Sequence, residues 1–411
     1  MAKALPRSPL AQPLPRLLPV AGVRLGAVAA QIRYKDRTDL MMMEFVPGTT
    51  AAGVFTRSKC PGAPIDWSRA ALAQGKARAL VVNSGNANVF TGRAGVIATQ
   101  ISAAAAARVV HCPATEVFLA STGVIGEPLD AERISDAMPQ LYEALSPEGW
   151  EDAARAIMTT DTFPKAATRQ VEIGGKTVTL QGIAKGSGMI APDMATMLGF
   201  VVTDAAISHD VLQSLLREGT ERSFNAITVD SDTSTSDMVL VFATAQADHD
   251  EITSLTDPAL AAFREALDSL LLELALMVVR DGEGATRMFT VRVSGAVSDE
   301  SAKKIALAVG NSPLVKTAIA GEDANWGRVV MAVGKSGEPA NRDTLSVAIG
   351  NVWIARQGTV VEGYDETPVV AHMKGQDIDI QIDLGLANGH AQIWSCDLTH
   401  GYIDINGSYR S

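Results

Sequence analysis

The sequence is poor in cysteine and in positive charge, and each shortage excludes a class of protein. Cys60, Cys112 and Cys396 are the only cysteines among 411 residues. Their odd number and scattered spacing exclude a disulfide framework and a CxxC-type zinc site, and fit a reducing compartment. We therefore expect the protein in the cytoplasm. The 35 Lys and Arg residues against 46 Asp and Glu give a net charge of −11, which argues against a nucleic-acid partner.

Long apolar runs and several common site motifs are also missing. No stretch approaches 18 uncharged apolar residues, and the most apolar one, 270–279, is interrupted by Glu273. We expect that segment to be a buried helix and expect no membrane span. The histidines show neither HExxH nor clustered spacing, so no metal site is expected. The absence of GxSxG and GxxxxGK[ST] removes the α/β-hydrolase elbow and the phosphate loop.

What the sequence does contain is typical of an α/β enzyme. Hydrophobic residues make up 47% of the chain, mostly Ala, Val, Leu and Ile, and there are 35 glycines. This mixture suits closely packed helices and many tight turns, and the length suits two to three domains. Residues 1–35 carry six basic residues before the first acid, but five prolines would break an amphipathic targeting helix. We expect a loose N-terminal arm over residues 1–20.

The hydrophobic pattern predicts interleaved strands and helices in both halves of the chain. We expect strands over 79–83, 117–120, 200–204, 238–244, 290–294, 351–356, 377–384 and 391–397, and a hairpin over 171–183. We expect helices over 95–110, 148–158, 208–221, 257–279 and 300–309, and turns over 83–88 and 121–126. This order favours a layered, mixed-sheet α/β fold over a pure Rossmann fold.

The densest candidate for chemistry is the stretch 185–198, KGSGMIAPDMATML. Its glycines permit backbone shapes and close approaches that other residues resist. The hydroxyl of Thr196 is a weak nucleophile unless a base lies beside it, and the α-amine of the same residue can be that base when the residue is N-terminal. That role requires cleavage of the Ala195–Thr196 bond. Taken alone, the spacing favours a strained structural turn over a catalytic loop.

Three other stretches combine turn residues with polar groups. The backbone N–H groups of 121–126, STGVIG, can form a nest for an oxyanion, although an ordinary turn is the simpler interpretation. The segment 229–237 holds three carboxylates but fails the EF-hand spacing, so a hydrogen-bonded turn is favoured over a metal site. Glu283 lies between two glycines after a long expected helix, where a carboxylate can bind a substrate ammonium or simply be solvated.

Seven motifs occur in a fixed order, and together they indicate a family resemblance that a single motif would not establish. They are NSGNAN (83–88), STGVIG (121–126), MTTDT (158–162), KGSGMIAPDMATML (185–198), DGEGAT (281–286), VKTAI (315–319) with NWGR (325–328), and DING (404–407). The chain resembles the ornithine acetyltransferase (glutamate N-acetyltransferase) family of arginine biosynthesis over nearly its whole length beyond the N-terminal arm.

The resemblance implies a transferase that cleaves itself. In that family the bond before the threonine of MATML is cut autocatalytically, which here implies an α chain of residues 1–195 and a β chain of 196–411. The implied fold is a layered α/β sandwich, similar in logic to N-terminal-nucleophile hydrolases. The two chains are expected to stay associated as a heterotetramer. Acetyl is expected to pass from N2-acetylornithine to Thr196 and then to glutamate, giving ornithine and N-acetylglutamate.

The resemblance also implies which residues form the site. The family's oxyanion hole maps onto Thr122 and Gly123. Its substrate-binding positions map onto Thr159, Lys185, Thr196, Glu283, Asn406 and Ser411. Thr159 and Thr160 are both open for the first of these, and we take Thr159. By charge, Lys185 suits an α-carboxylate and Glu283 suits the δ-ammonium of ornithine. A glutamate side chain there would be repelled by Glu283, and a water, Arg280 or a shifted pose could relieve the repulsion.

Some alternatives stay open at this level. No cofactor or metal is implied, and acetyl-CoA stays open as a co-substrate because bifunctional and monofunctional members share these motifs. Ser231 and Ser236 stand where Gly and Asn are more usual, which leaves any shared role of the 229–237 carboxylates open, and Ser411 replaces a Thr but keeps the hydroxyl. The competing classes are a self-cleaved amidohydrolase or aminopeptidase, in which water resolves the acyl-threonine, and an inert binding protein that keeps Thr196 uncut.

Overall fold

The computed structural model describes residues 6–35, 37–191 and 197–407. The chain divides into two compact units. The larger unit comprises Pro13–Asn225 and Asp232–Val278, and the smaller unit comprises Met1–Gln12, Ala226–Ser231 and Val279–Ser411. None of the boundaries between the two units falls at the expected cleavage point, and each expected chain contributes residues to both units.

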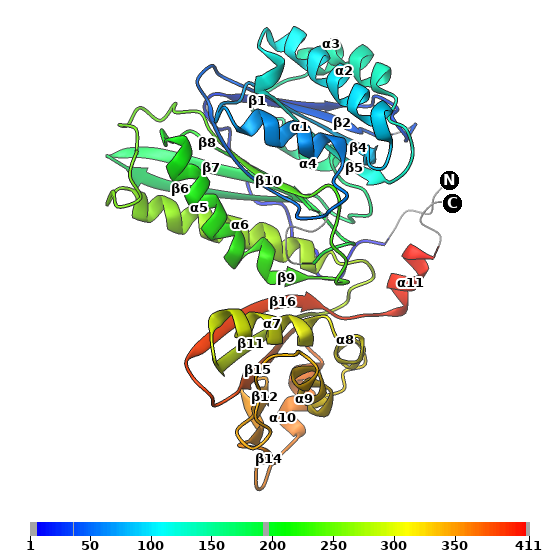
Figure 1. Ribbon diagram of the computed structural model, residues 1–411, viewed down its shortest axis with the longest axis vertical. Coiled ribbons are helices and arrows are strands. Elements are labelled where there is room, and N and C mark those ends of the chain that lie inside the picture. Colours follow the sequence, from blue (N-terminus) through cyan, green and yellow to red (C-terminus); the bar gives the residue numbers. More distant parts are fainter. Residues whose placement is uncertain (1–5, 36, 192–196, 408–411) are drawn as a thin grey trace. The chain divides into compact units, whose positions relative to one another are not determined.

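The larger unit contains two mixed β-sheets (Figure 1). The first has the order β1 (Val23–Val28), β2 (Leu40–Phe45), β4 (Ala79–Asn86) and β5 (Val117–Val124). The second has the order β3 (Thr50–Phe55), β10 (Met238–Ala243), β8 (Leu198–Thr203), β7 (Lys176–Lys185) and β6 (Lys165–Ile173). In each sheet one neighbouring pair, β4–β5 or β8–β10, is parallel and the other pairs are antiparallel. The expected mixed-sheet architecture is therefore confirmed.

The outer faces of the two sheets are covered by α2 (Gly92–Val110), α3 (Ala131–Glu143), α5 (His209–Arg222) and α6 (Leu260–Arg280). The helices α1 (Ala63–Leu72) and α4 (Trp150–Ala156) instead contribute side chains to the core between the sheets, and the short 3-10 turns are η1 (Ala114–Glu116) and η2 (Phe224–Ala226). In Figure 1, α2 and α3 lie over the first sheet, and α5 and α6 lie under the second. The result is a layered sandwich of helices, sheet, sheet and helices.

The core lies between the two sheets because their strands are apolar on both faces. In β2, Met41 and Met43 belong to the core between the sheets, whereas Leu40 and Met42 pack under α2 and α3. This alternation follows from the two-residue period of a strand. Contact between the sheets is direct, since the ring of Phe242 in β10 lies 5.6 Å from that of Phe118 in β5.

The N-terminal arm has no helix or strand over residues 6–20, yet its residues 13–20 are packed within the larger unit. Leu14 and Leu17 lie against the core between the sheets. The backbone N–H of Leu18 donates to Oε1 of Gln181 in β7 at 2.7 Å. The arm therefore lacks regular secondary structure, but these side chains tie it to the fold.

The smaller unit is built on one seven-stranded sheet. Its order is β14 (Thr359–Val360), β13 (Val352–Arg356), β12 (Ser346–Ile349), β15 (Asp377–Asp383), β11 (Met288–Ala296), β16 (Gly389–Cys396) and β9 (Ile227–Thr228). Its helices are α7 (Asp299–Gly310), α8 (Pro313–Ala320), α9 (Trp326–Gly334), α10 (Thr367–Met373) and α11 (His400–Asn406). In β15 every second residue is buried, as expected for a sheet with helices on one face.

Two expected turns are wrong. The strand expected over 79–83 continues as β4 to Asn86, and the one expected over 117–120 continues as β5 to Val124. The glycines there do not break the ladder, because Gly85 pairs with Gly123 in a close approach of the two backbones. The hairpin around 174–175 is confirmed, with Ile173 paired with Lys176.

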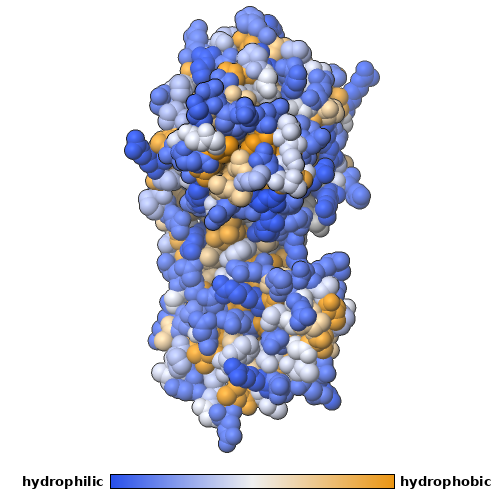
Figure 2. Space-filling model, turned by 90° about the vertical axis from the view of Figure 1, so that its left-hand side faces the viewer, coloured by the Kyte–Doolittle hydropathy of each residue, from blue (hydrophilic) through white to orange (hydrophobic). Residues whose placement is uncertain are grey.

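The described helices and the face shown in Figure 2 can be compared with what a membrane-spanning helix requires. None of these helices is both long enough and apolar enough to cross a membrane. The face in Figure 2 is mostly hydrophilic, and its apolar residues appear in small groups.

Candidate active site

Lys185 is the centre of a buried polar cluster in the larger unit. It is the last residue of β7, where it pairs with Leu198 of β8, and only 2% of it is exposed. Its Nζ donates to Oγ1 of Thr159 at 2.9 Å and to Oγ1 of Thr122 at 3.1 Å. Three of the residues that the resemblance implies are thus brought together from β5, β7 and the segment that precedes β6.

A second lysine and an aspartate complete this cluster. Lys165 begins β6 beside the end of β7, and Oδ1 of Asp161 accepts hydrogen bonds from its Nζ and from the N–H of Gly186, both at 2.7 Å. The other oxygen, Oδ2, accepts from the N–H of Thr159 at 3.0 Å and lies 4.0 Å from Nζ of Lys185. Asp161 therefore holds the segments that carry Thr159 and Lys185 in one arrangement.

The two lysines keep the Asp161 carboxyl ionised. Burial opposes the ionisation of Asp161, but the ammonium groups of Lys165 and Lys185 outweigh it and hold the pKa of the carboxyl well below its usual range. The carboxylate of Asp161 lies within ion-pair distance of both ammonium groups, at 2.7 Å from Nζ of Lys165 and 4.0 Å from Nζ of Lys185.

Gly123 occupies a position that requires glycine. Its φ is +129°, and a Cβ added there would lie 2.3 Å from the carbonyl carbon of Gly85. Glycine therefore lets β4 and β5 approach at the residue that follows Thr122. The Thr122 hydroxyl faces Lys185 and the Gly123 peptide is adjacent to it, so the proposed oxyanion donors lie beside the buried ammonium.

Glu283 and Asn406 meet in the smaller unit. Nδ2 of Asn406, the last residue of α11, donates to Oε2 of Glu283 at 2.6 Å. Glu283 is 7% exposed. Gly284 is required after it, because its φ is +74° and a Cβ would lie 2.5 Å from the backbone nitrogen of Tyr402. The motifs DGEGAT and DING are thus neighbours around one carboxylate.

Three of the expected site residues lie outside the described residues. They are Ala195 and Thr196, the expected cleavage site and nucleophile, and Ser411. The described residue next to Thr196 is Met197, whose N–H donates to Oδ1 of Asp237 at 2.9 Å.

The sequence did not assign roles to Asp161, Lys165 and Asp237. Asp161 stands within the motif MTTDT, and the spacing of four residues from Asp161 to Lys165 is an ion-pair signal only in a helix, which this segment is not. Asp237 was one of three carboxylates in 229–237. Burial raises its pKa well above the usual value, against the N–H of Met197, the Ser234 hydroxyl and the charge of Lys185.

The segment 229–237 is a hydrogen-bonded turn, as the sequence favours. Oγ1 of Thr56 donates to the carbonyl of Ser234 at 2.6 Å, and the N–H of Ser236 donates to Oγ of Ser234 at 3.1 Å. Over the ranges that the structure describes, no group of three His, Cys, Asp or Glu residues could hold a metal ion.

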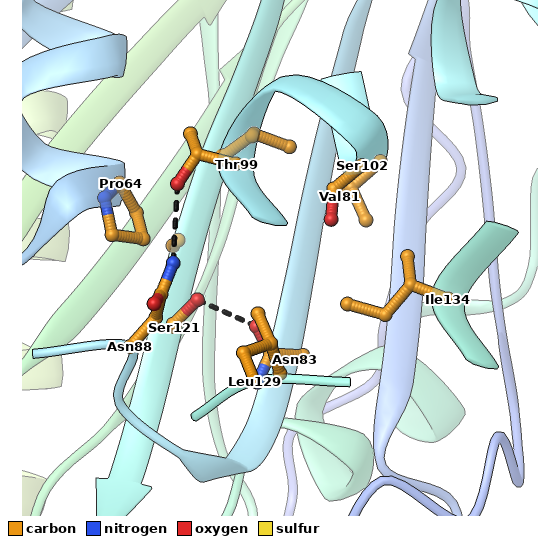
Figure 3. Close-up of a pocket in the computed structure, with 11 residues that line it drawn as sticks. Pro64, Val81, Asn83, Asn88, Thr99, Ser102, Ser121, Leu129 and Ile134 are labelled. Carbon is orange, nitrogen blue, oxygen red and sulfur yellow. Dashed lines mark hydrogen bonds between the residues drawn. The ribbon is translucent and has the colours of Figure 1, made fainter. Parts of the chain in front are cut away.

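The polar residues of 83–88 point inward rather than into a substrate site. Oγ of Ser121 donates to Oδ1 of Asn83 at 2.5 Å, and Nδ2 of Asn88 donates to Oγ1 of Thr99 at 3.1 Å (Figure 3). The cavity beside them measures about 10 Å³, which is about one water molecule at most. These residues brace the ends of β4 and β5, which carry Gly85 and Gly123.

Comparisons with known proteins agree with this picture. A family model described as the ArgJ family matches residues 24–411. The arginine biosynthesis bifunctional protein ArgJ of Gluconobacter oxydans is 67% identical over 411 residues, 100% of this chain and 97% of the relative. The protein of the same name from Brucella suis is 58% identical over 408 residues, 98% and 99% of the two chains.

A solved structure extends the likeness to three dimensions. The crystal structure of arginine biosynthesis bifunctional protein ArgJ from Bacillus halodurans has 43% sequence identity and a TM-score of 0.50. It covers 52% of this chain and 100% of that chain. Together with the match of the family model over residues 24–411, these likenesses confirm the relationship that the order of the seven motifs predicts: the chain belongs to the ArgJ family.

Proposed function

We propose that this chain is a self-cleaving acetyltransferase of arginine biosynthesis that moves an acetyl group from N2-acetylornithine to glutamate. One observation carries the proposal: a buried ammonium, Lys185, lies between the hydroxyls of Thr159 and Thr122 at the end of the strand that leads to Thr196. Membership of the ArgJ family supplies the reaction class, and the relatives' names place them in arginine biosynthesis.

The first step we propose is cleavage between Ala195 and Thr196. The Thr196 hydroxyl attacks the carbonyl of Ala195, the acyl group moves from nitrogen to oxygen, and water hydrolyses the resulting ester. The freed α-amine has an ordinary pKa of about 7.7–8.0 and can act as general base for its own hydroxyl. Thr122 and Gly123 would stabilise the oxyanion, a contribution of about 10²–10³-fold per donor.

The transfer itself then runs in two halves through acetyl-Thr196. N2-acetylornithine acylates the hydroxyl and leaves as ornithine, and glutamate takes the acetyl group to give N-acetylglutamate. Lys185 would bind the α-carboxylate of either amino acid, and Asp161 would keep it in place. We assign the δ-ammonium of ornithine to Glu283 with Asn406 beside it, and further substrate contacts to Thr159 and Ser411.

The names of the relatives also bear on the acetyl donor. Both relatives are called bifunctional. We therefore propose that acetyl-CoA serves as a second donor to glutamate, as a co-substrate rather than a resident cofactor. A location in the cytoplasm and assembly as a heterotetramer are part of the same proposal.

The second sheet of the larger unit explains how the cut chains would stay together. Its order is β3-β10-β8-β7-β6. Strands β3, β7 and β6 precede the expected cut and β8 and β10 follow it, so the strands of the two chains are interleaved. Separation would break the ladders β3–β10 and β7–β8 and expose the core between the sheets.

Intact mass spectrometry of the denatured protein, before and after mixing with N2-acetylornithine, tests the proposal. We expect two chains divided between Ala195 and Thr196, with one acetyl group added to the chain that begins at Thr196. A Thr196→Ala variant should stay uncut and gain no acetyl group. A wild-type chain that stays uncut and never gains mass would refute the proposal. A cut chain whose acetyl group is lost to water equally fast with and without glutamate would favour an amidohydrolase.

A further inference from the structure

The segment that follows β16 is bound closely to the loop that carries Glu283. Oδ1 of Asp397 accepts from the N–H groups of Thr286 at 2.8 Å and of Arg287 at 3.1 Å, and its Oδ2 accepts from the hydroxyl of Thr286 at 2.5 Å. The N–H of Asp397 donates to the carbonyl of Arg287 at 3.0 Å. Because Asp397 is only 3% exposed, these bonds fix the end of the loop out of contact with bulk water.

Thr399 lies where this loop meets α11. Its hydroxyl donates to the carbonyl of Gly284 at 2.6 Å and accepts from the N–H of Gly401 at 3.1 Å, which caps the helix. The two backbones are close here, since a Cβ added at Gly401 would lie 3.0 Å from the Cα of Gly284. One side chain therefore joins the residue that follows Glu283 to the start of the helix that ends at Asn406.

The end of α11 is bound to Glu283 itself. Nδ2 of Asn406 donates to Oε2 of Glu283 at 2.6 Å and to the carbonyl of Tyr402 at 3.1 Å. The hydroxyl of Tyr402 donates to Oδ2 of Asp230 at 3.1 Å, which ties the helix to the segment after β9. Both hydrogens of the Asn406 amide are thus directed at protein acceptors, so its oxygen is the atom that can accept from a substrate ammonium beside the Glu283 carboxylate.

We propose that Thr399 is a positioning residue that holds Glu283 and Asn406 together as one binding group for the δ-ammonium of N2-acetylornithine. This inference rests on the assignment of that ammonium to Glu283 in the proposed function. A carboxylate and an amide oxygen bind an ammonium well only when both lie at hydrogen-bond distance from it. Loss of the Thr399 hydroxyl frees the loop from the helix and lets the two groups move apart, while both side chains remain.

The contacts of Asp397 and Thr399 with the loop differ in place and in burial. Asp397 binds Thr286 and Arg287, farther along the loop from Glu283, and is almost fully buried. Thr399 binds the residue directly after Glu283 and is only half-buried. A substitution at Thr399 therefore acts on the placement of the Glu283 side chain more than on the core of the unit.

Steady-state kinetics of the full chain with Thr399→Val tests the inference. Valine keeps the shape of threonine but has no hydroxyl. The KM for N2-acetylornithine should rise about 10-fold, because a misplaced binding group costs up to about 10²-fold. The kcat should change little, because a contact that is equal in the ground state and the transition state affects KM alone. The KM for glutamate should not rise, because its side-chain carboxylate does not use the ammonium site. Thr399→Ser restores the hydroxyl and should recover most of the loss.

Thr344 offers a matched control in the same unit. Its hydroxyl donates to the carbonyl of Leu384, also at 2.6 Å, and the residue is likewise half-buried. This bond joins the segment before β12 to the residue that follows β15, and not to the loop that carries Glu283. Thr344→Val should therefore leave both KM values as in the wild type, even where it lowers the melting temperature.

A double variant separates positioning from a general loss of structure. If Thr399 acts through Glu283, Thr399→Val should raise the KM for N2-acetylornithine no further in a Glu283→Gln chain. Additive effects would overturn the inference, and so would a parallel rise in the KM for glutamate, the same change in Thr344→Val, or no recovery in Thr399→Ser. Where Thr399→Val is too unstable to assay, Thr399→Ala carries the same comparisons. An unchanged KM for N2-acetylornithine in Glu283→Gln, or a wild type that moves no acetyl group, would instead refute the proposed function.

Discussion

Removal of the Asp161 carboxylate should lower the free energy of unfolding far more than removal of a surface charge does. The carboxylate accepts from Nζ of Lys165 and the N–H of Gly186 at 2.7 Å, and from the N–H of Thr159 at 3.0 Å. Both side chains of the ion pair are 0% exposed. An Asp161→Ala substitution leaves a buried ammonium without its carboxylate, which typically costs about 3–5 kcal/mol.

Urea unfolding followed by circular dichroism measures this cost. A matched surface control is Glu151→Ala, since Glu151 and Arg155 form an exposed pair at 2.7 Å with 52% of each side chain exposed. That control should cost less than about 1 kcal/mol. Adding Lys165→Met to Asp161→Ala should recover part of the loss, because it removes the buried charge that the single variant leaves behind.

The same substitution predicts a change in acid stability. The pKa of Asp161 is lower in the folded protein than the value of about 3.9 in an unfolded chain. Its stabilisation is therefore complete above that unfolded value and is lost as the pH falls through it toward the folded value. Asp161→Ala should lack this part of the acid transition. The reasoning is refuted if Asp161→Ala costs no more than Glu151→Ala, or if the double variant is no more stable than the single one.

Three further predictions concern the site. Gly123→Ala places a Cβ 2.3 Å from the carbonyl carbon of Gly85. It should lower the thermal midpoint and reduce turnover by about 10²-fold or more. A variant with wild-type stability and turnover would contradict the close approach. Glu283→Gln keeps the hydrogen bond to Asn406 but loses the negative charge. In steady-state kinetics the KM for N2-acetylornithine should rise about 10–100-fold, whereas the KM for glutamate should not rise. A parallel rise in both KM values would exclude the assignment of the ornithine ammonium to Glu283. Asp237→Asn should be more stable than wild type at pH 7–8. The pKa of Asp237 is higher in the folded than in the unfolded protein, so the wild type loses stability as the pH rises above the unfolded pKa. Equal melting curves from pH 5 to 8 would show that folding does not raise the pKa of Asp237.

Much of the fold could be predicted because its periodicities are local. Strands such as β2 alternate between two buried faces, and the hairpin between β6 and β7 carries its own Gly174–Gly175 signal. The expected turns at 83–88 and 121–126 failed for a non-local reason. Glycine and asparagine indicate turns on their own, but Gly85 and Gly123 face each other across two strands that are about 40 residues apart in sequence.

The candidate site likewise contains residues that the sequence could predict and residues that it could not. The family resemblance carried by the seven motifs pointed to Lys185, Thr159 and Thr122, and the structure places their polar atoms within hydrogen-bond distance. Glu283 and Asn406 likewise meet, although 123 residues separate them. Sequence spacing does not predict the residues that hold these groups in place, because their positions depend on where β6, β7 and β10 end in space.

Asp161 and Asp237 show what sequence alone could not supply. Both are aspartates in polar, turn-like segments, both are buried, and nothing in their neighbours along the chain separates them. Burial favours the neutral form of each, so the difference comes from the partners. Two ammonium groups face Asp161 and keep it charged, whereas Asp237 meets one N–H, one hydroxyl and a more distant Lys185. The partners therefore shift the two pKa values in opposite directions, below the usual value for Asp161 and above it for Asp237, although both carboxyls are buried.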